Sequence, residues 1–243
     1  MKNVFLKSVS SLFVMILFLT SCNAQSFGRV KGNGNVVNKT RNVGSFEQLG
    51  VGGSFDVLLK KGDEGKIDIK IEDNLLPYLI TEVKNGKLKI KWKSGTNIST
   101  RKSVNLVVYF KEINAIGVSG ASDVVVKDVI KSDDFEVAVS GSGDIELGIN
   151  TNSLNTSVSG SGDIDLSGTT KSFEASVAGS GDIDAYELIS DKAKLKISGS
   201  GGMTLTVNKE LEARVSGSGD IRYKGNPKIE DIKVSGSGNV SSH

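Results

Sequence analysis

A row of aspartates is the feature of this sequence best placed to do chemistry. One acidic residue recurs at the same position of a repeated Val-Ser-Gly-Ser-Gly-Asp-Ile motif or a variant of it, at Asp56, Asp123, Asp144, Asp163, Asp182 and Asp220. If the motifs stack on neighbouring strands, their carboxylates face one another and repel. Calcium, which takes oxygen ligands, could bridge such carboxylates.

A structural role for the aspartates is the competing interpretation. Each carboxylate could accept backbone N–H groups at its own corner of the chain, as in an Asx turn. Asn35 and Asn239 occupy the same motif position and keep an acceptor without the charge, and Gly202 has no side chain at all. These substitutions favour the structural role. Contact with a cation or a glycan stays the open alternative at Asp123, Asp144, Asp163, Asp182 and Asp220.

Other residues with chemical potential are few. A series of motif serines could bind a glycan through their hydroxyls or simply face water: Ser140, Ser142, Ser159, Ser161, Ser216, Ser218, Ser235 and Ser237. The chain has one histidine, His243, and one cysteine, Cys22. A nucleophilic serine would therefore lack a positioned base, and a metal centre of His and Cys cannot be assembled.

A glycosidase is the enzyme class that needs only carboxylates. Two acids roughly 5–9 Å apart suit glycoside hydrolysis, and Asp163 with Asp182 could satisfy that spacing. A repeat supplies such pairs automatically, however, and we see no local cluster of acids, arginine and aromatics that breaks its regularity. We therefore expect no enzyme, no cofactor and no metal, and keep a polysaccharide-binding or polysaccharide-degrading β-helix as the alternative.

The repeat itself predicts the architecture that positions these residues. Clear copies are 18–21 residues apart, and degenerate copies start at Val30 and Val51. Within a unit, apolar residues alternate with polar ones, which indicates strands with one buried face. Stacked units can share a continuous core, and parallel crossovers are nearly always right-handed. We predict an all-β fold, a right-handed parallel β-helix of about 19-residue coils. The clear copies start at Val118, Val139, Val158, Val177, Ile197, Val215 and Val234.

Two local features refine this picture. Parity would place Gly160 and Gly162 on the inward side of a narrowing coil, so we interpret Gly-Ser-Gly as a bend. Residues 60–113 interrupt the repeat, with a short helical turn predicted near Pro77 and a two-residue hairpin at Asn85-Gly86. We expect this segment to be a small β-rich insertion that thickens or caps one end of the solenoid.

The N-terminus predicts export. Lys2 and Lys7 precede a short apolar run, which is typical of a secretory signal and too short to span a bilayer. The segment Leu19-Thr20-Ser21-Cys22 resembles the lipobox of bacterial lipoproteins, in which the cysteine is lipidated. We expect Cys22 to attach the protein to a membrane, most simply the outer membrane of the cell envelope, facing the periplasm or the surface. The expected divisions are a signal peptide at 1–21, a lipidated tether at 22–28 and a β-helical head at 29–243.

The Gly-Ser-Gly-Asp-Ile units, the Asn74–Trp92 segment and the lipoprotein signal resemble the auto-transporter adhesin head family, also called the GIN domain. This resemblance implies a β-helical fold and an adhesive, ligand-binding or structural role, and it brings no catalytic residues. A glycan or a protein is the expected ligand. The net charge of +2, with no basic stripe, argues against nucleic acid as a partner. Because the sequence stops three residues after the last motif, uncovered strand edges predict a homodimer through the solenoid ends.

Overall fold

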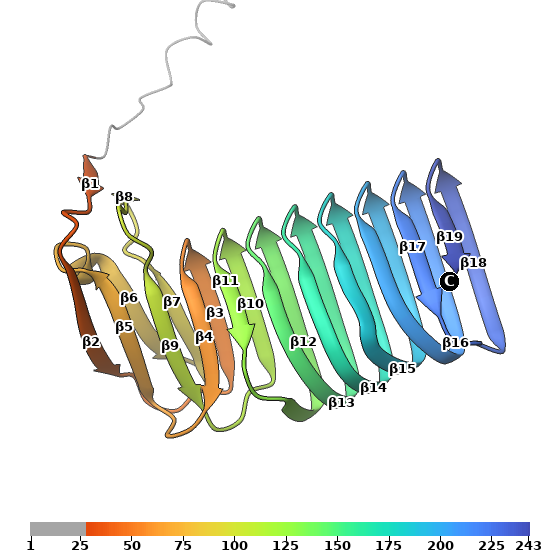
Figure 1. The fold of residues 1–243 in the computed structure, drawn as a ribbon, viewed down its shortest axis with the longest axis horizontal. Helices are drawn as coiled ribbons and strands as arrows, with labels where there is room; N and C mark the ends of the chain where they lie inside the picture. The colour runs from red at the N-terminus through yellow and green to blue at the C-terminus, as the bar shows by residue number, and fades with distance from the viewer. Residues whose placement is uncertain (1–27) are drawn as a thin grey trace, which may run out of the picture.

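The computed structural model describes residues 28–243 and shows an all-β solenoid of about seven turns with a curled sheet at its N-terminal end (Figure 1). This confirms the predicted fold class. The predicted signal peptide and the candidate lipidation site Cys22 lie outside the described residues. Within residues 28–243, no helix has the length and apolar character required to cross a membrane.

Each regular coil is one long strand that bends midway, followed by a short corner. The first halves of these strands stack in parallel as sheet 1 and the second halves as sheet 2 (Figure 1). Equivalent residues pair directly, so Val139 lies beside Val158 and Val158 beside Val177. The long strands are β13 (Ile145–Gly160), β14 (Ile164–Gly179), β15 (Ile183–Gly199) and β16 (Gly202–Gly217), whereas the coil before them is divided into β11 (Asp123–Val126) and β12 (Ile130–Gly141).

The core lies between the two sheets. In β13, Ile145, Leu147 and Ile149 are buried from sheet 1, and Leu154 and Val158 from sheet 2. Alternate residues face solvent, as the period of two requires. The repeated apolar positions of the sequence are therefore the axis of the solenoid.

The motif glycines allow neighbouring coils to approach closely. A Cβ on the buried Gly162 would lie 2.1 Å from the carbonyl oxygen of Gly143 in the preceding coil. Gly160 has φ +130°, which side-chain-bearing residues rarely adopt. The Gly-Ser-Gly bend is confirmed, but its reason differs from the prediction. A side chain at either glycine would collide with the backbone of the preceding coil. Gly160 is also partly exposed and does not face inward.

The first coil comes from a degenerate motif copy. The Val51 copy stacks on the solenoid, since β3 pairs in parallel with β10 and β4 with β11. Ser122 in the next corner links the two coils, because its Oγ accepts the Phe55 N–H at 3.0 Å. The strands are β3 (Gln48–Gly53), β4 (Asp56–Lys61), β10 (Ala115–Gly120) and β11 (Asp123–Val126).

The predicted insertion forms the rest of a structure that we call the cap, residues 29–113. Two parallel strands continue the solenoid sheets, β7 beside β3 and β9 beside β4 (Figure 1). Two antiparallel strands come next, β6 beside β7 and β5 beside β9. Asn85 and Gly86 have φ 53° and 71°, which confirms the hairpin, and a 3-10 turn at Leu76–Tyr78 confirms the helical turn. The strands are β2 (Val36–Asn42), β5 (Lys66–Glu72), β6 (Leu79–Lys84), β7 (Lys87–Trp92) and β9 (Asn105–Phe110).

The degenerate copy at Val30 does not form a coil, which corrects the expectation that every copy closes one. Its first strand, β1 (Arg29–Lys31), pairs with β8 (Asn97–Ser99), and β2 runs antiparallel to β5. The reason is the buried carboxylate of Glu72, which accepts the Gly34 N–H at 2.5 Å and the Arg101 N–H at 2.8 Å. These bonds hold the Gly-rich segment at the end of β5 instead of on the solenoid.

The C-terminal end is uncovered. β18 (Ile229–Gly236) and β19 (Asn239–Ser242) each pair along one edge only within the part of the chain that the structure describes. Glu230 stands in the inward row, beside the core residue Leu211, and accepts the Tyr223 hydroxyl at 3.0 Å. An inward charge is one way to discourage pairing at a sheet edge. The expected homodimer through this end stays a prediction.

Candidate ligand-binding site

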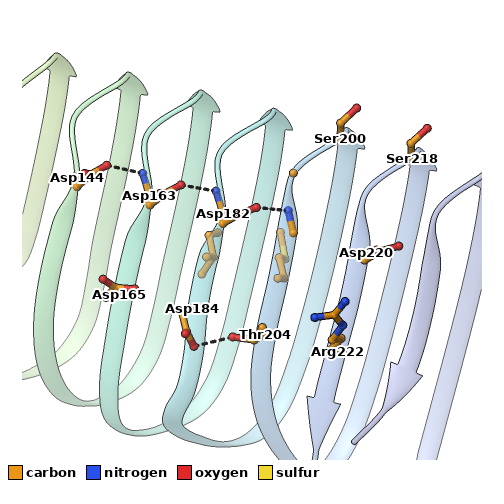
Figure 2. Close-up of a pocket in the computed structure, with 14 residues that line it drawn as sticks. Asp144, Asp163, Asp165, Asp182, Asp184, Ser200, Thr204, Ser218, Asp220 and Arg222 are labelled. Carbon is orange, nitrogen blue, oxygen red and sulfur yellow. Dashed lines mark hydrogen bonds between the residues drawn. The ribbon is translucent and has the colours of Figure 1, made fainter.

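The motif aspartates form a ladder along one edge of the solenoid (Figure 2). The Asp163 N–H donates to Asp144 Oδ1 at 2.8 Å, and the Asp182 N–H donates to Asp163 Oδ1 at 2.8 Å. Asp123 and Asp220 accept in the same way from Asp144 and Asn239, at 3.3 and 2.9 Å. The carboxylates therefore accept backbone N–H groups, but from the next coil and not from their own corner as predicted.

This ladder explains the substitutions at the motif position. Asn239 needs only its backbone N–H to bond to Asp220, and Gly202 likewise donates its N–H to Asp182 Oδ1 at 2.5 Å. The first member, Asp56, instead accepts the side-chain amide of Asn105 at 2.7 Å. The motif serines are exposed. Across residues 28–243, no group of three His, Cys, Asp or Glu side chains is arranged to hold a metal ion.

A second column of polar residues lies beside the ladder on the outer face of sheet 1. Strand pairing places five equivalent residues side by side in consecutive coils, namely Glu146, Asp165, Asp184, Thr204 and Arg222. The Thr204 hydroxyl donates to Asp184 Oδ1 at 2.6 Å (Figure 2). Partial burial, together with the negative charges of Asp184 and Glu146, raises the pKa of Asp165. The column changes from acidic to basic along the solenoid.

A hollow lies between these two columns, and Gly202, which has no side chain, is part of its lining. Its volume is about 530 Å³. Asp182 and Asp184 stand on one side, Asp220 and Arg222 on the other, and Thr204 lies between them (Figure 2). Gly202 also lies between the two sides, because it pairs with Asp220 and donates its N–H to Asp182. We call this feature the Gly202 hollow. It offers carboxylate acceptors, a guanidinium donor and hydroxyls within one depression.

An irregularity in β15 lies next to the hollow. The register with β14 shifts between Asp165 and Ser167, and the register with β16 shifts between Ala185 and Ile189. Such bulges bend a strand and re-aim its side chains. Tyr186 lies in the shifted stretch, where Lys224 Nζ is 4.1 Å from its ring centroid. A second groove, lined by Tyr186 and Lys224, shares Asp165 and Asp184 with the hollow.

Sequence reasoning missed this gathering of residues. It correctly aligned Asp144, Asp163, Asp182 and Asp220, which all line the hollow, whereas Asp123 does not. It did not anticipate that Arg222 lies with the acids at the hollow, or that Tyr186 lies with Asp165 and Asp184 in the neighbouring groove. The signals were Gly202 in place of the motif Asp and two successive repeats of 20 and 18 residues.

The arrangement suits binding by hydrogen bonds and charge. Asp163 and Asp182, the predicted candidate pair for glycoside hydrolysis, occupy adjacent rungs of the ladder, and each commits one oxygen to a backbone N–H. Their remaining oxygens, with the hydroxyls and Arg222, can contact a polar molecule lying along the face. A ligand with several hydroxyl groups would find both donors and acceptors there.

Known proteins share both the sequence pattern and the fold of this chain. The family model described as "Putative auto-transporter adhesin, head GIN domain" matches residues 45–227. A putative adhesin from Bacteroides fragilis shares 22% identity and a TM-score of 0.81, covering 88% of this chain and 100% of that one. A putative adhesin from Parabacteroides distasonis shares 25% identity and a TM-score of 0.72, covering 88% and 100%.

A second Parabacteroides distasonis structure is described differently, as a putative lipid binding protein. It shares 29% identity and a TM-score of 0.73, covering 88% of this chain and 99% of that chain. No match was found among curated proteins.

Proposed function

Because this chain belongs to the auto-transporter adhesin head GIN domain family, we propose that it is the β-helical head of a cell-envelope lipoprotein that binds a glycan through the outer face of sheet 1. The observation that carries the proposal is the Gly202 hollow. It interrupts an otherwise repetitive polar face, and its lining combines carboxylates, hydroxyls and Arg222. A purely structural solenoid has no need of that interruption.

Attachment to the membrane is the second part of the proposal. The signal-like segment and the lipobox-like Leu19-Thr20-Ser21-Cys22 support lipidation of Cys22. The first strand that the structure describes, β1, lies a few residues after Cys22, so a lipid on Cys22 would hold the cap near the membrane and leave the column of coils to extend from it. Such a head acts by binding, and we expect no release of product from glycans.

The attachment is tested by metabolic labelling with a fatty-acid analogue. Wild-type protein should incorporate the label and fractionate with outer membranes, whereas Cys22→Ser should do neither. Protease treatment of intact cells then reports which side the head faces. A head degraded only after the cells are lysed would contradict a surface adhesin, and an unlabelled wild-type protein would contradict the lipid anchor.

Glycan binding is tested by applying the head, residues 29–243, to immobilised envelope and host glycans. Gly202→Asp would fill the hollow with the usual motif side chain, and a Cβ at that position meets Asp182 Oδ1 at 3.1 Å without reaching any backbone closely. We expect this variant to fold and to lose binding. Glu136→Gln, an exposed acid on sheet 2, is the matched control. Equal binding by all three proteins would contradict the proposed face.

Lipid binding is a second candidate, because one structural relative is described in those terms and the last coil exposes apolar side chains. Ile229 is 60% exposed, Val234 43% and Ile232 37%. If the open end contacts lipid, the head should sediment with phosphatidylethanolamine–phosphatidylglycerol vesicles, and Ile232→Lys should release it. Sedimentation unaffected by Ile232→Lys would exclude this end as the contact.

A further inference from the structure

The second column crosses the Gly202 hollow from negative to positive charge. Asp165, Asp184, Thr204 and Arg222 pair as neighbours on four consecutive strands. Adjacent strands lie about 4.8 Å apart, so the backbones carrying Asp184 and Arg222 are separated by about 9.6 Å. Thr204 between them is uncharged (Figure 2). Gly202, two residues before Thr204, has no side chain and lines the same hollow.

The positive end of the column is available to a ligand. Arg222 is exposed, and within residues 28–243 it forms no salt bridge, whereas Arg214 contacts both Glu212 and Asp231. Its neighbours in the column, Thr204 and Ser241, carry no charge. A guanidinium in this situation can present its planar donors to a carboxylate.

The negative end holds more charge than its contacts satisfy. Asp165 faces Glu146 on one side and Asp184 on the other, and no cationic side chain forms a salt bridge with any of the three in the described chain. Asp184 Oδ1 accepts the Thr204 hydroxyl at 2.6 Å and the Tyr186 N–H at 3.1 Å, and its other oxygen has no hydrogen-bond partner within residues 28–243. An amino group bound here would reduce the mutual repulsion of these carboxylates.

Neither a simple cation nor a simple anion uses the whole depression. A cation leaves Arg222 without a partner, and an anion large enough to span the hollow meets the carboxylates. We propose that the Gly202 hollow binds a zwitterionic saccharide, with its amino group on Asp165 and Asp184 and its carboxylate on Arg222. Hydroxyls of the sugar contact Thr204. This inference rests on the proposed glycan-binding function and names the class of ligand.

The test uses a defined zwitterionic probe, 6-aminohexanoate, whose charges lie at the two ends of a short chain. Amide resonances of 15N-labelled residues 29–243 are followed while the probe, hexanoate or hexylamine is added. Shifts should concentrate at Asp165, Asp184 and residues 202–204 and 220–222. We expect the zwitterion to bind about tenfold more tightly than either singly charged probe, since each added charged contact contributes on the order of that factor.

Three variants separate the two charged contacts from the shape of the hollow. Arg222→Gln should reduce the affinity for the zwitterion to that for hexylamine. Asp184→Asn should reduce it toward that for hexanoate. Gly202→Asp should abolish the shifts, whereas Glu136→Gln should leave them unchanged. Retained amide spectra outside the hollow show that each variant is folded.

Two results would overturn the inference. Hexylamine binding as tightly as the zwitterion, with no effect of Arg222→Gln, would reduce the site to a nonspecific acidic surface. No shift near Gly202 with any probe would remove the site. Failure of the glycan-binding proposal looks different, because the head would then bind the small probe at this hollow but retain no immobilised glycan.

Discussion

The cap and the column of coils share the same two sheets but are stabilised in opposite ways. In the column, residues 115–242, each coil repeats the contacts of the one before, so that Gly162 meets Gly143 as Gly181 meets Gly162. In the cap, single contacts join segments distant in sequence, such as Phe55 and Trp92, whose ring centroids are 5.0 Å apart. The comparison teaches that stacked coils need the same small residue at the same position of every coil. Closing the end of the solenoid instead needs particular side chains that each make a contact found nowhere else in the repeat.

Two carboxylates show the same contrast. Burial alone would raise the pKa of Glu72 in the cap, but the backbone N–H groups of Arg101, Gly34 and Lys102 outweigh this effect and lower it. In the column, the pKa of Asp165 is raised by partial burial and by neighbouring acids. The cap uses its carboxylate for structure, and the column leaves a charge unsatisfied on its surface.

The largest effect should follow from breaking the uniform stacking of the column. Gly162→Ala would place a Cβ 2.1 Å from the Gly143 carbonyl oxygen, and the backbone of two coils must separate. We expect a loss of at least about 3 kcal/mol in the free energy of unfolding, measured by urea denaturation. Gly117→Ala is the control, because its nearest neighbour would be 3.9 Å away. Equal losses in both variants would show that backbone freedom, not stacking, explains the glycines.

Removing the buried charge of Glu72 in the cap should have the next largest effect on stability. Glu72→Gln puts an amide N–H₂ against backbone N–H donors, which should lower the free energy of unfolding by about 2 kcal/mol. Because the folded pKa of Glu72 is lowered from 4.5, its stabilisation is complete above that pH and is lost as pH falls through the folded value. Thermal denaturation from pH 7 to 3 should therefore show the two proteins converging in acid.

Asp165→Asn provides the opposite sign and sharpens the comparison. Its raised folded pKa means that the ionised form disfavours folding at neutral pH, and that protonation removes the penalty as pH falls through the folded value. The Asn variant should melt slightly higher than wild type at pH 7, with the difference vanishing in acid. A variant that melts lower at pH 7 would contradict the unsatisfied charge.

The open end of the column should be convertible into an interface. Glu230 interrupts the inward apolar row of the last coil, and Glu230→Leu would restore it. We expect about a tenfold increase in the self-association constant, equivalent to about 1.4 kcal/mol, measured by analytical ultracentrifugation. Wild-type dimers that Ile232→Lys dissolves would support the predicted contact through the solenoid end. Association unchanged by both substitutions would place any dimer interface elsewhere.

The smallest effect concerns one polar atom in the column core. The Thr156 hydroxyl is buried without a hydrogen-bond partner in the described structure. Thr156→Val keeps the shape and removes the unpaired oxygen, so the free energy of unfolding should rise by about 1 kcal/mol. Thr170→Val is the matched control, because the Thr170 hydroxyl donates to the Ser172 carbonyl at 3.0 Å. A loss of stability in Thr156→Val would indicate a hydrogen bond that the structure does not show.

The sequence by itself determined the coil, its corner and the buried rows. Alternation within a unit, as at Leu154 and Val158, reports which side of one strand is buried, and this depends on local parity alone. The spacing of the motif then set the coil length, because equivalent residues such as Val139 and Val158 must lie side by side for their apolar faces to merge.

Only the tertiary structure decided which segments touch. The sequence could not show that Glu72 holds the Val30 motif copy away from the column, that each Asp bonds to the next coil, or that Gly202 and Arg222 share one hollow with Asp184. These contacts depend on the register between strands and on shifts such as the one in β15. The physical reason is that the apolar pattern of one segment shows which of its own side chains are buried. A contact depends on how two segments are positioned relative to each other, and the pattern of either one does not contain that information.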